Sequence, residues 1–348
     1  MPLLSYVVIA YLFLAILLYL LLGGADFGGG IIELFTSEKN RRVTRETVYH
    51  AIGPIWEANH MWLIIAVVIL FVGFPRIYTT MSVHLHLPLL ALLLGIIARG
   101  TAFGFRHYDA VHDRMQGVYS RIFVYSSAIT PFFLGVIAGS ALAGYIDPLA
   151  TDFWTAYVGS WLHPFALAVG VFTVALCGYL AAVYTIGEAR TAPDRQRFVR
   201  KTRLLTVVAV VAGALVFVAA YMEKLPLLHW VLGNAVGRTA LGLATASLGL
   251  LWLRLDRGNT AMLRILAGFQ VTMILLAVGY AHFPNFLMLR GGHHLSLVDE
   301  LAPPRTVEAL GQALLLGSLL ILPALFYLYY SFERDKSHGQ VPAATQPD

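Results

Sequence analysis

Residues 3–25 read LLSYVVIAYLFLAILLYLLLGGA and contain no Asp, Glu, Lys or Arg. A helix needs about 20 apolar residues to cross the hydrocarbon layer of a membrane. The segment has neither a basic start nor a small-residue cleavage site, so we interpret it as a membrane span and not as a cleaved signal peptide. The rest of the 348-residue chain is similar: 58% of the residues are apolar, 12% are charged and the mean hydropathy is +0.73. Because soluble domains carry about 25% charged residues, this composition excludes soluble, nucleic-acid-binding and disordered proteins.

Eight further stretches have the composition of membrane spans, so the sequence predicts nine in all. They cover residues 3–25, 58–75, 77–98, 122–146, 161–187, 204–222, 239–253, 265–289 and 309–332. We expect an all-α integral membrane protein in which the helices form two four-helix bundles plus one extra helix. Residues 1–333 are expected to form one membrane domain, and residues 334–348 a disordered cytoplasmic tail.

Lys and Arg concentrate in alternate loops, at residues 39–45, 106–121, 190–203 and 254–264. Cytoplasmic loops carry this excess of basic residues, so we expect the N-terminus outside and the C-terminus inside, which an odd number of spans requires. The net charge of +5 is then a signal of topology and not a binding patch. The single cysteine, Cys177, excludes an internal disulfide and any cysteine-based metal centre.

Three charged residues lie inside or at the ends of predicted spans: Asp26, Glu57 and Arg99. Each costs roughly 2.5–3.5 kcal/mol or more to insert, so each is a candidate functional residue. Arg99 precedes Arg106 by seven residues, which places it roughly 10 Å deeper on about the same helix face. Arg99 can therefore pair with either acid. Such a pair could lock three helices together, or it could form a proton-accepting cluster that is open to the cytoplasm.

The histidines do not predict a haem site. His84 and His86 are two residues apart and cannot share a helix face, and a pair such as His86 and His282 has no supporting motif. A b-type cytochrome with its own haem stays as one alternative. A secondary transporter with an Asp/Glu/Arg ion site is another, but it predicts midplane polar residues and an inverted repeat, and we find neither.

Three motifs together resemble subunit II of the cytochrome bd-type quinol oxidases of prokaryotic membranes. They are GADFGGG at residues 24–30, GPIWEANHMWLI at residues 53–64 and RGTAFGFR at residues 99–106. The motifs lie within roughly the first 106 residues, and beyond them the match depends on length, span count and orientation. The resemblance implies a multi-pass protein of the cytoplasmic (inner) membrane.

The resemblance also implies an enzyme complex, a quinol:oxygen oxidoreductase that generates a proton-motive force. A sister subunit I carries haems b558, b595 and d, dioxygen is reduced to water with electrons from quinol, and the protons come from the cytoplasm. This chain then has no catalytic residue, metal ligand or haem ligand of its own. Family members can also hold a structural quinone in this subunit, and small single-span accessory subunits can join the complex.

Site residues follow from the matching motif positions. The resemblance implies a proton pathway through Glu57, Asp26, Arg99 and His60. It implies oxygen access or a subunit interface at Trp56, Trp62 and Asn59.

The sequence departs from the family pattern at three places. Glu57-Ala58 stands where Asp-Gly is usual, His60 replaces a glutamate or glutamine, and Gly104 occupies a position that is often acidic. Glu57 keeps a negative charge at this position, so we expect the proton function to be retained more readily than the exact geometry of the route. A route that uses a carboxylate at position 104 must differ here.

Overall fold

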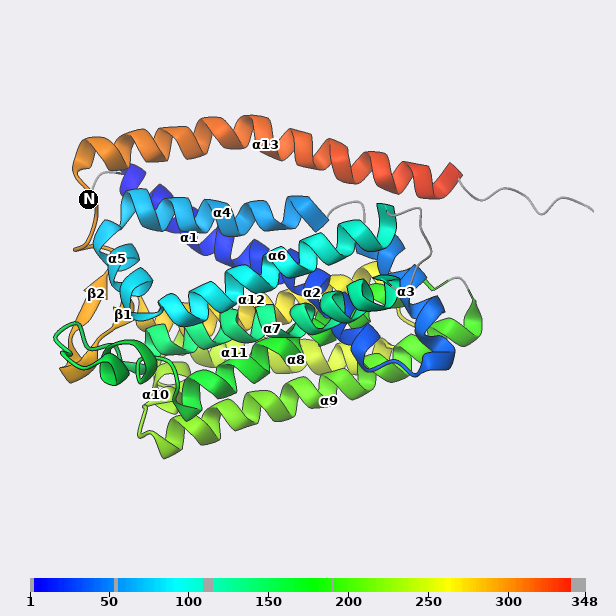
Figure 1. Ribbon diagram of the computed structural model, residues 1–348, viewed down its shortest axis with the longest axis horizontal. Coiled ribbons are helices and arrows are strands. Elements are labelled where there is room, and N and C mark those ends of the chain that lie inside the picture. Colours follow the sequence, from blue (N-terminus) through cyan, green and yellow to red (C-terminus); the bar gives the residue numbers. More distant parts are fainter. Residues whose placement is uncertain (1–2, 53–55, 109–114, 190, 339–348) are drawn as a thin grey trace, which may run out of the picture.

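Long apolar helices make up most of the chain (Figure 1). The computed structural model describes residues 3–52, 56–108, 115–189 and 191–338. At some helix ends, including Trp56 and Glu57, it describes the backbone but not the side chains.

The helices are α1 (Leu3–Leu18), α2 (Gly24–Leu34), α3 (Glu38–Ile52), α4 (Trp56–Gly73), α5 (Pro75–His84), α6 (His86–Tyr108), α7 (Met115–Ala143), α8 (Pro164–Ile186), α9 (Ala192–Met222), α10 (Leu227–Leu232), α11 (Ala235–Arg254), α12 (Thr260–His282) and α13 (Pro304–His338). Two short strands, β1 (Asn285–Met288) and β2 (His294–Ser296), form an antiparallel hairpin.

The helix lengths confirm an all-α membrane fold. Within the described residues, eight helices are long and apolar enough to span a membrane, and the bent pair α4–α5 raises the number to nine if it counts as one span. The first of these spans is longer than expected. A π-helical segment, Tyr19–Gly23, joins α1 to α2, so the span runs from Leu3 to Leu34 and Asp26 lies well inside it.

The predicted third span, residues 77–98, is wrong in its boundaries. Pro75 starts a separate helix, α5, because the residue before a proline is pushed out of the α-region and Phe74 accordingly has φ −137° and ψ 60°. The chain bends by 114° there, and the third span begins only at His86.

Two other boundaries also differ from the expectation. The fifth span starts at Pro164, where the side chain of His163 caps α8. The last helix, α13, continues to His338, into the segment that was expected to be disordered.

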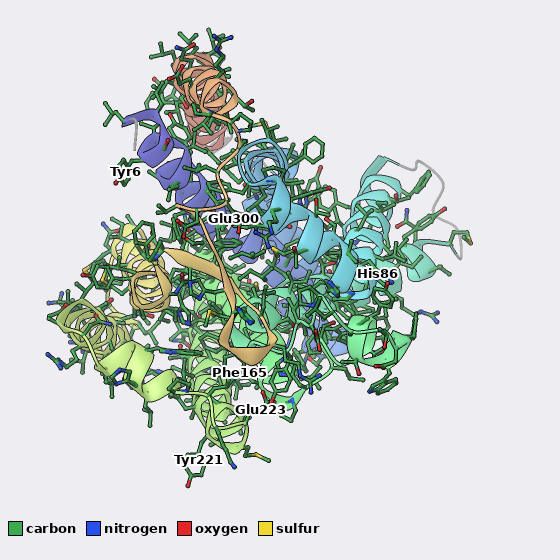
Figure 2. The ribbon with its side chains drawn as sticks, turned by 90° about the vertical axis from the view of Figure 1, so that its left-hand side faces the viewer. Tyr6, His86, Phe165, Tyr221, Glu223 and Glu300 are labelled. Atoms are coloured by element: carbon green, nitrogen blue, oxygen red, sulfur yellow. The ribbon has the colours of Figure 1, made fainter. Side chains whose placement is uncertain are left out.

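The helices form two groups with α8 between them. α1, α2, α4, α6 and α7 make the first group, and α8, α9, α11 and α12 the second; α8 packs against both α7 and α2. Figure 2 looks along the helices and shows α13 outside this body, where it packs mainly on α1 and α4.

The two ends of the helix bundle differ in character (Figure 1). One end, the hairpin end, carries α5, α10 and the β1–β2 hairpin. The opposite end, the basic end, carries α3 and the arginine-rich connections α8–α9 and α11–α12. The buried charges described next lie toward this second end.

Candidate functional site: a buried charged column

Asp26 and Arg99 form an ion pair inside the first helix group. The Arg99 Nη2 atom donates to Asp26 Oδ1 at 2.7 Å and to the Asp26 carbonyl oxygen at 3.1 Å. Arg99 Nε donates to the Ser127 hydroxyl at 3.1 Å. The side chains of Asp26 and Arg99 are 0% and 1% exposed. The pair therefore joins α2, α6 and α7 without direct access to solvent in this chain.

Aromatic rings surround the Arg99 guanidinium. Its Cζ atom lies 5.2 Å from the centroid of the Phe27 ring and 5.0 Å from that of Phe123. Ring faces attract cations, by about 2 kcal/mol or more where water is excluded. The rings thus compensate part of the cost of burying this cation.

The glycines of residues 28–30 let α2 approach its neighbours. A Cβ atom added to Gly28 would lie 2.0 Å from the carbonyl oxygen of Cys177 on α8. One added to Gly30 would lie 2.3 Å from the hydroxyl oxygen of Ser127 on α7. The glycine run therefore positions Asp26 by allowing close helix packing.

A second set of buried charges, which sequence reasoning missed, lies nearer the basic end. Glu33 is 1% exposed and accepts from Arg106 Nη2 at 2.7 Å. Its other oxygen accepts from Arg45 Nη2 at 3.0 Å, and Arg45 on α3 is 34% exposed. Phe123 contacts both sets, because its ring centroid lies 5.0 Å from the Arg99 Cζ atom and 4.9 Å from the Arg106 Cζ atom.

The missed set could have been found from spacing. Asp26 and Glu33 are seven residues apart, as are Arg99 and Arg106. Seven residues make about two helical turns, so each pair lies on one face of its helix. Ending the first span at Ala25 hid this match, because Glu33 then counted as a loop residue.

The α4 motif lies on another side of Asp26. Asn59 Nδ2 donates to the Leu22 carbonyl oxygen in the π-helical segment at 3.4 Å. The His60 ring centroid is 5.8 Å from that of Phe27 and 6.1 Å from that of Tyr19. Trp62 is 9% exposed and belongs to the same apolar cluster as Tyr19 and Phe27.

The structure thus brings four of the predicted site residues into one region: Asp26, Arg99, Asn59 and His60, with Trp62 in the adjoining cluster. Glu57 and Trp56 lie in the first turn of α4, and their side chains are outside the described part of the structure.

Several polar atoms of this region have no hydrogen-bond partner among the described residues. They are Asp26 Oδ2, Tyr19 Oη, Asn59 Oδ1 and Arg99 Nη1. A buried polar atom without a partner costs about 1–3 kcal/mol, and in native proteins ordered water usually satisfies such atoms. Ordered water bound here would satisfy the free atoms of Asp26, Tyr19 and Asn59, which come from α2, the π-helical segment and α4.

Three buried histidines, His84, His163 and His282, use their Nδ1 atoms in polar contacts. Nδ1 of His84 donates to the Ala156 carbonyl oxygen at 3.0 Å, and Nδ1 of His282 donates to that of Val278 at 2.8 Å. His163 Nδ1 lies 3.1 Å from a Glu223 carboxylate oxygen. No histidine lines the cavity of about 510 Å³ among α8, α9, α11 and α12, or the groove of about 600 Å³ between α6 and α7. Within the described residues, no three His, Cys, Asp or Glu side chains are grouped to hold a metal ion.

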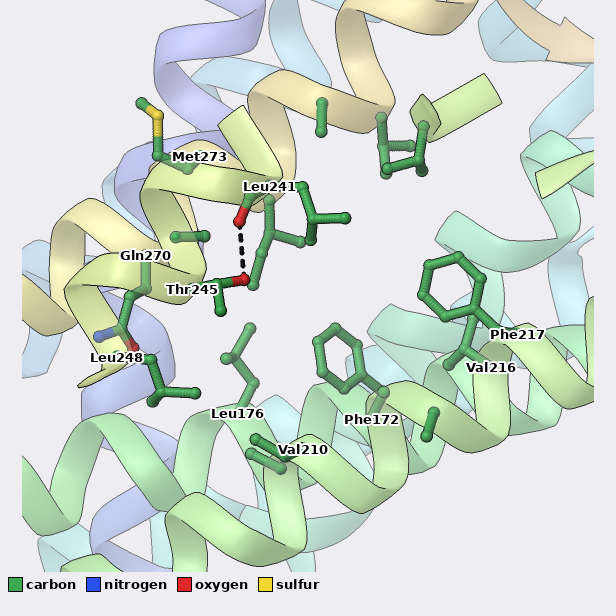
Figure 3. A pocket seen from close by; sticks show the side chains of 18 of the residues that line it. Phe172, Leu176, Val210, Val216, Phe217, Leu241, Thr245, Leu248, Gln270 and Met273 are labelled. Carbon is green, nitrogen blue, oxygen red and sulfur yellow. Dashed lines mark hydrogen bonds between the residues drawn. The ribbon is translucent and has the colours of Figure 1, made fainter. Parts of the chain in front are cut away.

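A cavity of about 510 Å³ lies between α8, α9, α11 and α12, and we call it the α9–α11 cleft (Figure 3). Its walls are mostly aliphatic and aromatic. The Tyr179 hydroxyl donates to Gln270 at 2.6 Å, and the hydroxyls of Thr206 and Thr245 donate to carbonyl oxygens of their own helices. These hydroxyl protons are already used, and among the polar side chains of the lining only Gln270 offers N–H donors: its Nε2 atom carries two and donates to Ser247 at 3.3 Å. The walls therefore favour a hydrocarbon chain.

Comparisons with known proteins agree with the geometry. The family model described as cytochrome bd terminal oxidase subunit II matches residues 4–332. The chain is 24% identical over 345 residues to cytochrome bd ubiquinol oxidase subunit 2 of Bacillus subtilis, covering 96% of each chain. It is 24% identical over 294 residues to cytochrome bd-I ubiquinol oxidase subunit 2 of Escherichia coli, covering 75% of this chain and 76% of that one.

A solved structure shows the same fold. A chain of the bd oxidase from Geobacillus thermodenitrificans superposes with a TM-score of 0.75 at 20% identity, covering 94% of this chain and 98% of that chain. With the family match over almost the whole length, the chain belongs to the cytochrome bd terminal oxidase subunit II family, and it is a multi-pass subunit of an oxidoreductase complex of the bacterial inner membrane.

Proposed function

We propose that this chain supplies protons from the cytoplasm to a haem-bearing subunit I, which reduces dioxygen with electrons from quinol. The observation that carries the proposal is the buried Asp26–Arg99 pair with its unpartnered Asp26 Oδ2 atom. In this proposal the haems belong to the partner. When bound there, the haems supply the electron transfer to dioxygen.

The basic end faces the cytoplasm in this proposal. The arginine-rich connections lie at that end, and cytoplasmic loops retain basic residues. The N-terminus is then outside and the C-terminus inside. Protons enter from the basic end, where the described part of α4 begins.

Protons approach Asp26 along α4 and not along the Glu33 column. Glu57 and His60 are three residues apart, so they share one face of α4. Three arginines accompany Glu33 and Asp26 on the other side, and buried arginines raise an electrostatic barrier to protons. Arg99 keeps one Asp26 oxygen occupied and leaves Oδ2 for water or for a proton carrier.

The partner docks on the side of α4, α6 and α13. α13 is the least buried of the spans, with 11% of its most apolar window buried. Its side chains Leu316, Leu319 and Leu320 are 64–77% exposed. α6 adds exposed leucines and, with α7, lines a groove of about 600 Å³.

Asn59 donates to the π-helical segment and Trp62 belongs to the apolar cluster with Tyr19 and Phe27, and with Trp56 they are our candidates for an oxygen-access route. Trp62 belongs to an apolar cluster, and dioxygen dissolves well in such surroundings. Quinol, dioxygen and single-span accessory subunits are expected partners of the complex.

The proposal is tested by Glu57→Ala in the intact complex purified from its native membrane. We expect oxygen consumption per haem to fall by about tenfold or more, as when a proton-transfer group is removed, while haem content per complex stays the same. Glu46→Ala is the matched control, because Glu46 is an exposed carboxylate on α3 that pairs with Arg42. Unchanged turnover in Glu57→Ala would remove Glu57 from the route.

A further inference from the structure

The α9–α11 cleft separates two helix hairpins of the second group. α9 packs mainly on α8, and α11 packs mainly on α12. Small residues on the facing surfaces of α9 and α11 leave the space between them unfilled, including Ala209, Gly213 and Ala214 on α9 and Ala244 on α11. At the hairpin end, Leu227 and Val231 of α10 close the cleft. The cleft therefore opens sideways between α9 and α11, because buried residues such as Phe198, Leu251 and Leu255 fill the space between the helices nearer the basic end.

The occupant of the cleft must be apolar. Figure 3 shows aliphatic and aromatic side chains converging on the space, among them Phe172, Leu176 and Phe217. Water needs two to four polar partners to stay in a cavity, but Thr206 and Thr245 donate to their own helices. Because α9 and α11 both span the membrane, hydrocarbon is also what surrounds the opening.

The rim at the basic end carries an arginine. One turn beyond Thr206, the same face of α9 presents Arg203, which lies seven residues before the lining residue Val210. Arg203 forms an ion pair with Asp256 in the α11–α12 connection, and 39% of its side chain is exposed. On α11 the same stripe continues from Leu248 to Trp252, which is 41% exposed. Tryptophan at this level is typical of the membrane–water interface.

An apolar cleft with an arginine beside its basic end has the shape and charge of a phospholipid site. We propose that the α9–α11 cleft binds one acyl chain of an anionic phospholipid from the leaflet at the basic end, with its phosphate at Arg203. The lipid fills the space between the two hairpins and so holds α8–α9 and α11–α12 together. The site is independent of the proton route, because it lies in the other helix group.

The experiment is native mass spectrometry and lipid extraction of the intact complex after reconstitution in nanodiscs with equal amounts of phosphatidylglycerol and phosphatidylcholine. Ala214→Phe fills the cleft from α9, and Thr245→Phe fills it from α11, in case the first variant does not assemble. We expect each variant to retain one phospholipid fewer per complex than the unmodified protein. Val211→Phe is the matched control, because Val211 is 53% exposed on α9 but does not line the cleft.

The rim is tested separately with Arg203→Gln. This variant should keep the phospholipid, but its preference for phosphatidylglycerol over phosphatidylcholine should fall by about fivefold. Arg41→Gln, an exposed arginine on α3, should leave that preference unchanged. Retention of the same number of phospholipids by both cleft-filling variants would overturn the proposal. So would release by these variants of an isoprenoid quinone in place of a phospholipid, or an unchanged preference in the rim variant.

Discussion

Replacing Arg99 by methionine tests what the buried pair does. The change leaves Asp26, which is 0% exposed, without its cation and without the hydrogen bond of 2.7 Å. Breaking a buried ion pair from one side costs about 3–5 kcal/mol. At about 1.4 kcal/mol per factor of ten, the unfolding equilibrium changes by a factor of roughly a hundred to several thousand. The loss of the Phe27 and Phe123 ring contacts acts in the same direction.

The double variant Asp26→Leu/Arg99→Met separates stability from proton transfer. Removing both charges is often neutral or stabilising, because no buried charge is left unpaired. We therefore expect the complex to regain its thermal unfolding temperature and haem content but not its oxygen consumption. The assay is differential scanning calorimetry in nanodiscs with an oxygen electrode on the same samples. Full recovery of turnover would refute a proton role for Asp26 and would make the pair purely structural.

Two further predictions concern packing and pH. Gly28→Ala should destabilise the complex by about 1–3 kcal/mol, because the new methyl group would overlap the Cys177 carbonyl oxygen. Gly104→Ala should be nearly neutral, since nothing lies within 4 Å of its added Cβ atom. Thermal unfolding of both variants checks the difference, and equal effects would contradict the packing argument. Burial lowers the pKa of His163 below 6.5 despite the adjacent Glu223 carboxylate, so the unfolded chain binds the proton more readily and stability should fall as pH drops below about 6.5. His163→Gln should flatten this dependence in a pH series of unfolding temperatures, and an unchanged slope would show that another group is responsible. The Phe165 amide also donates to the Glu223 carboxylate, at 2.8 Å, and Figure 2 shows these two residues side by side.

The sequence was informative where burial has a high cost. Charge-free stretches of about 20 residues located the spans, because a charge inside the membrane is expensive, and the same argument singled out Asp26 and Arg99. The structure places these two in direct contact. The alternative partner that the sequence allowed, Glu57, lies outside the described side chains.

The same rule failed where charges neutralise one another. Glu33 and Arg106 are buried in the last turns of two membrane-spanning helices, where they pair with each other, and a rule that ends spans at charges cannot detect this. The separate helix α5 was missed because residues 77–84 contain no Asp, Glu, Lys or Arg and so passed as the start of the third span. The α9–α11 cleft depends on which faces of four helices meet, and hydropathy along one chain does not contain that information.

The most direct test of the central claim measures proton uptake during a single turnover. Fully reduced complex in proteoliposomes is mixed with dioxygen, and a pH dye on the side of the basic end reports proton uptake while absorbance follows the haems. With Glu57→Gln we expect the first oxygen-binding step to keep its rate, and proton uptake and the later haem oxidation to slow together by about tenfold or more. Proton uptake at the unmodified rate, on that side and in step with haem oxidation, would contradict a proton route through this subunit.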